Sequence, residues 1–235
     1  MAHKTLLFAM GDMPAWSLTA GYVVRACRSV YTRFVFLLQG GIKTIHVLPD
    51  YSNPLKEWGI TDYEAIFPEK GRIFDPNAAQ RQIENSRAVV VGGGHTPFYH
   101  KLFATEPMRS AIRKQFFSGV PYAGLSAGAL IAPARSAFWE SESGSGRDRI
   151  FEGLGLIDGF LLDVHFTQRQ RLAGLVEALA LSGLTKGYGI DEAACAVFKD
   201  GAFAGVIGQD VYRVELLNPR TREHRVAKMT LRYKG

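Results

Sequence analysis

The stretch PYAGLSAGALI (residues 121–131) decides the fold. An apolar run ends at Leu125, a serine follows between two glycines, and small apolar residues continue beyond it. This pattern predicts a strand, a sharp turn and a helix, the nucleophile elbow G-x-S-x-G. Gly124 and Gly128 would let the strand and helix approach closely while Ser126 takes a strained backbone conformation. An ordinary glycine-serine turn has the same composition, so the rest of the chain must support the elbow.

Length, composition and charge limit the class of protein. With 235 residues and 47% hydrophobic content, the chain can bury the core of one α/β domain spanning residues 1–235. The net charge of +6 is mild and no long basic run carries interleaved aromatics, so nucleic-acid binding is not indicated. Phe34–Leu38 is far too short to cross a membrane, and Leu6–Met10 is too short for a signal peptide. We therefore expect a cytoplasmic protein with no nucleic-acid or membrane partner.

The cysteines give no sign of a disulfide framework or a metal site. Cys27 and Cys195 both lie in apolar surroundings, and they lack the C-x-x-C spacing of zinc and redox motifs. They are expected to be buried thiols in a reducing compartment. We expect neither a metal nor an organic cofactor.

Short apolar runs alternate with helical patterns, which predicts a mostly parallel open sheet with helices on both faces. From Ala194 onward, β-branched and aromatic residues alternate between turn signals, which indicates antiparallel edge strands. The expected strands are Leu6–Met10, Thr44–Leu48, Ala88–Val91, Pro121–Leu125, Gly187–Ile190, Ala194–Phe198 and Ala202–Ile207. The expected helices are Ala20–Leu38, Asn77–Asn85, Met108–Ser118, Ala127–Ala134 and Phe166–Leu181. The polar, glycine-rich segment Trp139–Ile150 is expected to be a loop, either a solvated connector or a flap over a site.

A serine nucleophile needs a base, and His165 is the best placed of the six histidines. It stands between an apolar run and the helix expected from Phe166, where the helix dipole would keep the ring neutral and able to accept a proton. A helix-capping role is the alternative. His3 in the N-terminal tail and His46 in an expected strand are predicted to be structural or exposed.

Two further stretches offer groups for the same site. Gly92–Gly94 follows an expected strand and exposes backbone amides, which suits an oxyanion; the amide of Gly93 would join that of Ala127. The Walker lysine and the G-x-G-x-x-G spacing are both missing. Asp191 and Glu192 end another expected strand, where ligands of α/β sheets bind. Only one of two neighbours can face a given side of an extended chain.

Together these motifs resemble the peptidase E/cyanophycinase family of serine peptidases, which has a class I glutamine amidotransferase-like (flavodoxin-like) α/β fold. The resemblance rests on the triple glycine, the Ser-Ala-Gly-Ala elbow, the run Asp163–Arg171 and the pair Asp191–Glu192. It implies Ser126 as nucleophile, His165 as base and Glu192 as the acid that orients the base. It also implies hydrolysis of aspartyl-type peptide bonds, and it is compatible with a homodimer.

The resemblance implies substrate-binding positions as well. Arg169 and Arg171 match family arginines, and one or both would pair with the aspartyl carboxylate of the substrate. His95 and Asp163 are further candidate substrate-binding residues. Cyanophycinases typically carry glutamine where this chain has Val164 and His95, and a third arginine where it has Gly174, so a cyanophycin substrate is less expected.

We therefore expect a dipeptidase-like serine peptidase that acts on a small aspartyl-type peptide, with a cyanophycinase or isoaspartyl peptidase as the alternative substrate class. A second hypothesis is an α/β-hydrolase-type esterase, whose triad order would be met by Ser126, Asp191 and His224. A third is a scaffold of the same fold that binds a ligand without turnover.

Overall fold

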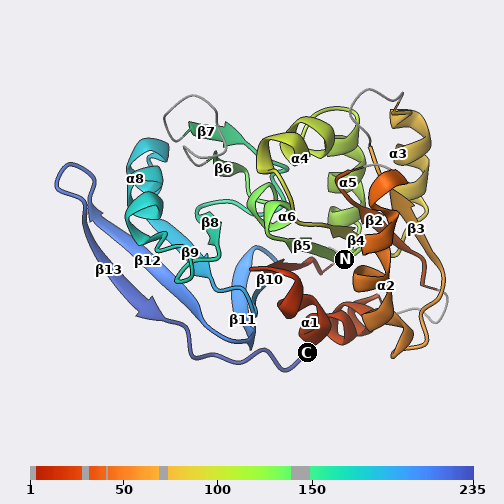
Figure 1. Ribbon diagram of the computed structural model, residues 1–235. Coiled ribbons are helices and arrows are strands. Elements are labelled where there is room, and N and C mark those ends of the chain that lie inside the picture. The colour runs from red at the N-terminus through yellow and green to blue at the C-terminus, as the bar shows by residue number, and fades with distance from the viewer. Residues whose placement is uncertain (1–3, 28–31, 41, 69–73, 139–148) are drawn as a thin grey trace.

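The computed structural model describes residues 4–27, 32–40, 42–68, 74–138 and 149–235 (Figure 1). Its largest sheet has the strand order β11-β10-β1-β5-β4-β2-β3. Five neighbouring strands of this sheet, β1, β5, β4, β2 and β3, run parallel, and β10 and β11 are antiparallel to them at one edge. The bounds are β1 Leu6–Met10, β2 Phe34–Leu37, β3 Tyr63–Ile66, β4 Ala88–Val91, β5 Tyr122–Leu125, β10 Ala194–Lys199 and β11 Ala202–Gly208.

A smaller sheet extends the molecule beyond that antiparallel edge (Figure 1). Its order is β13-β12-β9-β8, with β8 and β9 parallel and the other pairs antiparallel. Its strands are β8 Leu161–Val164, β9 Lys186–Ile190, β12 Val211–Asn218 and β13 Glu223–Lys228. A two-stranded ribbon joins β6 (Arg135–Phe138) to β7 (Arg149–Glu152).

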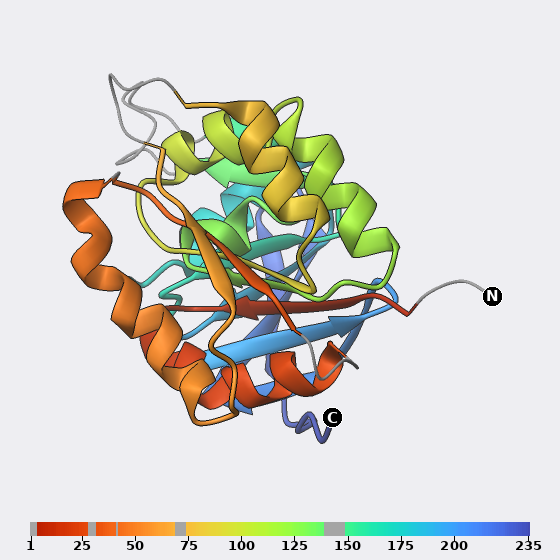
Figure 2. The same cartoon turned by 90° about the vertical axis from the view of Figure 1, so that its right-hand side faces the viewer.

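Helices cover both faces of the large sheet (Figure 2). The period-two alternation of β1 sorts its side chains: Phe8 and Met10 pack with the helices of one face, and Leu7 and Ala9 with those of the other. The first face carries α1 (Met13–Ala26) and α2 (Leu48–Lys56), which follows the 3₁₀ helix η1 (Ile42–Val47). The second carries α3 (Pro76–Glu84), α4 (Thr96–Phe103), α5 (Met108–Phe117) and α6 (Ala127–Leu130), and α8 (Leu172–Ser182) packs on the small sheet.

The predicted class, a mostly parallel sheet flanked by helices with antiparallel strands near the C-terminus, is confirmed. Six of the seven expected strands are present, as are the helices expected at Asn77–Asn85 and Met108–Ser118, within one or two residues. Strands β2, β3, β6, β7 and β8 and helices α2 and α4 were not predicted, and β12 and β13 lie in the region expected to form antiparallel strands but had no predicted bounds.

The expected helix Ala20–Leu38 is wrong at both ends. Helix α1 begins at Met13, where Asp12 caps it and Pro14 occupies its first turn. It ends at Ala26, and Phe34–Leu37 forms strand β2, which lies between β4 and the edge strand β3. A strand buried on both faces is continuously apolar, so it cannot be told from a buried helix by its periodicity.

Three other boundaries also differ. The expected strand Thr44–Leu48 lies in η1 and the start of α2, because Pro49 sits in the first turn of α2, where its missing amide costs no hydrogen bond. Helix α6 ends at Leu130 rather than Ala134, since Pro133 follows. Helix α8 begins at Leu172 instead of Phe166, because Gln170 has a φ of 52°, which a right-handed helix cannot include.

Residues 139–148 of the expected loop Trp139–Ile150 lie outside the described residues. Its two expected roles, a solvated connector or a flap over the site, therefore stay predictions. Both cysteines are unpaired; Cys195 is fully buried and Cys27 half-buried. Burial raises the pKa of Cys27 to about 12 and that of Cys195 further still, which fits two inert thiols. In the described part of the chain, no helix is long and apolar enough to span a bilayer.

Candidate active site

Ser126 sits at a strained elbow between β5 and α6. Its backbone has φ 47° and ψ −109°, a region that residues with side chains rarely occupy. A Cβ at Gly124 would lie 2.5 Å from the carbonyl carbon of Gly128, and one at Gly128 would lie 2.8 Å from that of Val91 in β4. Glycine is therefore required on both sides of the serine, as the sequence pattern predicts.

The groups that surround Ser126 come from the carboxyl ends of neighbouring strands. Asp12 follows β1, Gly92 follows β4 and Ser126 follows β5 in the large sheet; His165 follows β8, and Glu192 comes two residues after β9. The amide of Ser126 donates to the carbonyl of Met10 at 3.0 Å, which fixes the elbow against the end of β1. Ligand sites of open α/β sheets lie at this edge.

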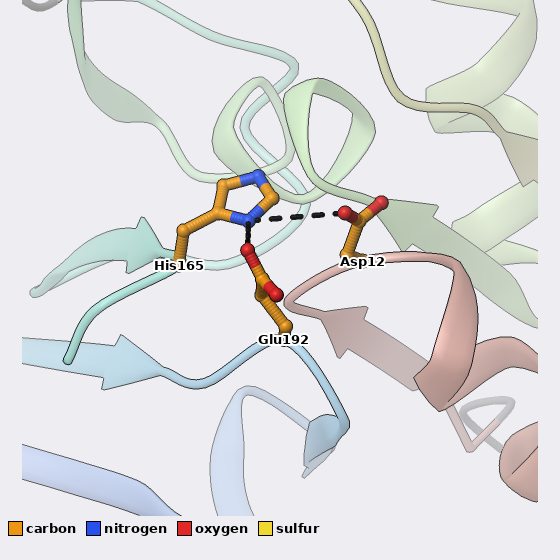
Figure 3. Close-up of side chains that lie close together, drawn as sticks. All are labelled: Asp12, His165 and Glu192. Atoms are coloured by element: carbon orange, nitrogen blue, oxygen red, sulfur yellow. Dashed lines mark hydrogen bonds and ion pairs between the residues drawn. The ribbon is translucent and has the colours of Figure 1, made fainter. Parts of the chain in front are cut away.

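Ser126, His165 and Glu192 form one hydrogen-bonded chain. Ser126 Oγ lies 3.0 Å from His165 Nε2, and His165 Nδ1 lies 2.9 Å from Glu192 Oε1. The His165 side chain is 6% exposed, whereas the Glu192 side chain is 41% exposed. Figure 3 shows the Glu192 carboxylate pointing at Nδ1.

A turn, and not a helix, holds the His165 ring. The residue has a φ of 51° directly after β8, and α8 begins only at Leu172, so the predicted helix-dipole effect on His165 is wrong. The amide of Phe166 donates to the carbonyl of Ile190 at 3.2 Å, and the Phe166 ring fills the space above Gly189, where a Cβ would overlap it. The histidine is thus placed by packing between β8 and β9.

The adjacent carboxylates Asp191 and Glu192 have separate contacts. Asp191 is buried, and its Oδ1 accepts hydrogen bonds from the amide and the hydroxyl of Thr167, both at 2.9 Å. Asp191 therefore anchors the turn that follows His165, and Glu192 contacts the imidazole. His224 is exposed on β13 with Nδ1 2.7 Å from the carbonyl oxygen of Arg222, so the esterase grouping of Ser126, Asp191 and His224 is not assembled among the described residues.

The two predicted oxyanion donors differ in their surroundings. The amide of Ala127 is the first of α6, and the first amides of a helix have no partner within it. Gly93 lies against the serine, since a Cβ there would be 3.3 Å from Ser126 Cβ. Its amide, however, donates to Tyr51 Oη over 3.3 Å. That bond is long and therefore weak, so an oxyanion would compete with the Tyr51 hydroxyl for the Gly93 amide.

Two tyrosines clamp the glycine loop, and the sequence analysis did not single them out. Tyr99 Oη donates to the carbonyl of Gly93 at 3.0 Å and accepts from the amide of Gln39 at 2.8 Å. Tyr51 and Tyr99 line a cavity of about 470 Å³ with Gly93 and Gly94. Burial raises the pKa of Tyr51, and the nearby Asp12 and Asp50 carboxylates raise it further, against the opposing effect of the Gly93 hydrogen bond. Both hydroxyls thus stay protonated.

The predicted substrate-binding residues fall into two groups. His95 is exposed at the start of α4, Arg169 is exposed and Arg171 half-buried in the turn between His165 and α8. Asp163, in contrast, is 0% exposed on β8, where its Oδ1 accepts from the amide of Val164 at 2.9 Å. Direct substrate contact by Asp163 is not supported, because its side chain has no exposed surface.

Asp12 is the site residue that the sequence analysis missed. Its Oδ1 accepts from the amide of Met13 at 2.8 Å, and its Oδ2 lies 3.9 Å from His165 Nδ1 (Figure 3). An aspartate shortly after a strand and two residues before Pro14 is a helix-start signal. That signal was obscured because the helix was expected to begin at Ala20.

Comparison with known proteins places the chain in a family. A model of peptidase family S51 matches residues 72–206, which include the glycine loop, the elbow, His165 and Glu192. A cyanophycinase of Geminocystis herdmanii is 33% identical over 163 residues, 68% of this chain and 60% of the relative. One of Trichormus variabilis is 27% identical over 74% of this chain and 59% of its own length. The chain thus spans about 60% of the length of these curated relatives.

Solved structures share the fold. A peptidase from an acI-B1 Actinobacterium superposes with a TM-score of 0.70 at 16% identity, over 90% of both chains. A putative peptidase E protein from Listeria monocytogenes superposes with a TM-score of 0.63 at 14% identity, over 85% of this chain and 96% of that one. With the family match spanning more than half of its residues, the chain belongs to peptidase family S51.

Proposed function

We propose that the chain is a serine peptidase with Ser126 as nucleophile, His165 as general base and Glu192 as the acid that orients the base. The observation that carries the proposal is the hydrogen-bonded chain from Ser126 Oγ through the imidazole to Glu192, starting at a strained elbow. A hydroxyl alone is a weak nucleophile, and a neighbouring base with its own orienting group is what activates it.

The contacts support a two-step acyl transfer. Glu192 accepts a hydrogen bond from Nδ1–H, which leaves the Nε2 lone pair facing Ser126 Oγ. As Oγ attacks the scissile carbonyl, its proton passes to Nε2, and Glu192 stabilises the imidazolium. The carbonyl oxygen becomes an oxyanion held by the amide of Ala127, with the Gly93 amide exchanging its long bond to Tyr51 for the oxyanion.

The imidazolium then returns the proton to the leaving amine, which departs and leaves an ester on Ser126. Water next gives a proton to Nε2 and attacks the ester carbonyl. As the intermediate collapses, the bond to Ser126 Oγ breaks, Nε2 returns the proton to Oγ, and the acid product leaves. Burial of the imidazole limits competing solvent contacts at Nδ1 and Nε2.

We propose small aspartyl-type peptides as substrates and a dipeptidase-like mode of cleavage. Arg169, exposed in the turn after His165, is available for a substrate carboxylate, and the 470 Å³ cavity beside Gly93 has room for one side chain or a short end of a peptide. The cyanophycinase names of its relatives make a β-aspartyl substrate the second candidate. Two unpaired cysteines are compatible with work in the cytoplasm.

A substrate panel tests this proposal. The purified protein is offered α-Asp-X and β-Asp-X dipeptides, cyanophycin and p-nitrophenyl esters; released amines are quantified for the peptides and released p-nitrophenolate for the esters. Cleavage of an aspartyl dipeptide is the expected result. Turnover of the esters alone would contradict a peptidase, and cleavage of cyanophycin in preference to dipeptides would replace the substrate proposed first.

The identity of the base is tested with two histidine variants. His165→Ala is expected to lower kcat roughly 10³-fold or more, because Ser126 then has no proton acceptor. The control is His224→Ala. The hydrogen bond described for the His224 ring is with the carbonyl of Arg222, so this variant is expected to keep wild-type kcat and KM. Steady-state kinetics on the best dipeptide give both values. Equal losses in the two variants would revive the esterase hypothesis.

The acid is tested with Glu192→Gln. An amide keeps the size of the side chain but cannot stabilise the imidazolium, so we expect kcat to fall roughly 10²-fold or more with little change in KM. The matched control is Glu177→Gln, which breaks a surface ion pair with Arg222 that involves none of the three proposed catalytic residues, and which should leave kcat unchanged. A Glu192→Gln enzyme as fast as the control would remove Glu192 from the triad.

A further inference from the structure

A second carboxylate, that of Asp12, faces the same ring nitrogen of His165 as Glu192 does, namely Nδ1. Asp12, His165 and Glu192 each offer one ligand atom, and these atoms lie within 4.8 Å of one another. Figure 3 shows both carboxylates converging on Nδ1, with Nε2 turned away from them. One carboxylate is enough to orient a histidine, so the second is not explained by the triad.

Backbone contacts hold Asp12 in this position. Its Oδ1 caps α1 by accepting from the amide of Met13 at 2.8 Å, which directs Oδ2 toward His165 at 3.9 Å. Gly11 brings the turn against the opposite loop: a Cβ there would lie 2.9 Å from Glu192 Cα and would overlap the carbonyl of Asp191. The two carboxylates are thus brought to the imidazole by contacts that do not involve the imidazole.

The donor set matches a borderline-soft divalent cation. Zn²⁺ takes one imidazole nitrogen and carboxylate oxygens at about 2.0–2.2 Å in a tetrahedral arrangement, with the fourth position open to water. Ligands of such an ion lie about 3.4 Å apart. Nδ1 and the Glu192 oxygen, now at 2.9 Å, would therefore separate by about half an ångström, and the Asp12 oxygen, 3.9 Å from Nδ1 and within 4.8 Å of the other two ligand atoms, would move inward by about an ångström. The Asp12 and Glu192 side chains are 43% and 41% exposed, which gives the ion a path from solvent.

We propose that Asp12, His165 and Glu192 bind Zn²⁺ or a similar divalent transition-metal ion, and that the bound ion switches the enzyme off. Binding uses the lone pair of Nδ1, so the single proton of the neutral ring must reside on Nε2. Nε2–H then donates to Ser126 Oγ, and the ring has no lone pair with which to accept the serine proton. The inhibition rests on the proposed function, whereas the binding does not.

Binding is measured first, without reference to activity. The Ser126→Ala protein is titrated against a chromophoric zinc chelator, with Mg²⁺ and Ca²⁺ in separate runs. We expect one Zn²⁺ to be taken up at this site and neither hard cation to compete, because imidazole suits transition metals and Mg²⁺ and Ca²⁺ prefer sites built of oxygen alone. Absence of zinc uptake in the micromolar range would overturn the proposal even if the peptidase function were correct.

Two variants separate the cluster from adventitious zinc on other histidines. Asp12→Ser, in the Ser126→Ala background, keeps an N-cap residue but removes the ligand. Loss of an outer-shell partner already costs metal sites about 10- to 100-fold in affinity, so loss of a ligand should weaken zinc binding by at least about tenfold. Asp50→Asn removes a carboxylate of the adjoining cavity that is not in the cluster, and it should leave zinc affinity unchanged. Equal affinities of the two variants would contradict the site.

Inhibition is then tested on the protein with Ser126 intact. Zn²⁺ should slow both peptide hydrolysis and fluorophosphonate labelling, and EDTA should restore both. With Asp12→Ser, half-inhibition, expressed relative to that variant's own uninhibited rate, should need roughly tenfold more Zn²⁺. If zinc binds through Asp12 but labelling is unaffected, the switch is wrong although the site is present; if no variant is active or labelled at all, the proposed function fails and the chelator titration still decides the site.

Discussion

Ser126→Ala should lower kcat for the best peptide substrate by roughly 10⁴- to 10⁶-fold. The substitution removes the only oxygen that contacts His165 Nε2 in the described structure, and no acyl-enzyme can form without it. Residual turnover would come from the oxyanion donors and binding alone. Initial rates at saturating substrate, with burst-phase analysis of the wild type, give the comparison.

The matched control is Ser110→Ala, which removes the hydroxyl of an exposed serine on α5. It should retain wild-type kinetics, and both variants should show cooperative thermal unfolding at temperatures close to that of the wild type. A Ser126→Ala protein that is folded and retains a tenth or more of the activity would show that another group is the nucleophile.

Gly128→Ala should destabilise the protein by about 3 kcal/mol or more and remove activity with it. The new Cβ would stand 2.8 Å from the carbonyl carbon of Val91 and overlap its oxygen, which belong to the backbone of the central strand β4 and cannot move aside cheaply. The amide of Gly128 also donates to Gly92 at 3.1 Å, so any retreat of α6 would pull the elbow off the glycine loop.

Gly183→Ala provides the comparison for that variant. Gly183 ends α8 with a φ of 70°, and an added Cβ would meet nothing within 4 Å, so only the cost of a left-handed residue, about 1 kcal/mol, is expected. Urea unfolding followed by circular dichroism measures both. A Gly128→Ala protein no less stable than Gly183→Ala, or one that keeps full activity, would contradict the close packing of the elbow.

The elbow and the class of fold were predictable because their signals are local. Strand, turn and helix around Ser126 are specified within eleven residues, and the glycine requirement follows from steric contact at the turn itself. The alternation of apolar runs with helical patterns likewise predicted the parallel sheet. Helix ends marked by an aspartate and a proline, as at α3, were also within reach.

The remainder depends on contacts between distant segments. Asp12 and His165 are 153 positions apart and meet because the carboxyl ends of β1 and β8, which belong to two different sheets, lie close together, and no local pattern reveals this. The positive φ of Gln170 prevented the helix expected from Phe166, and Tyr51 reaches Gly93 across 42 residues. Choosing Glu192 over Asp191 required the family resemblance, since alternation says only that neighbours face opposite sides.

The central claim, that Ser126 is a nucleophile activated by His165, is tested most directly by locating a covalent adduct. The protein is treated with a fluorophosphonate, digested, and the modified peptide sequenced by mass spectrometry. We predict one adduct, on the Ser126 oxygen, absent from Ser126→Ala and formed far more slowly in His165→Ala. An adduct on another residue, or labelling of Ser126 at the same rate without His165, would contradict the account.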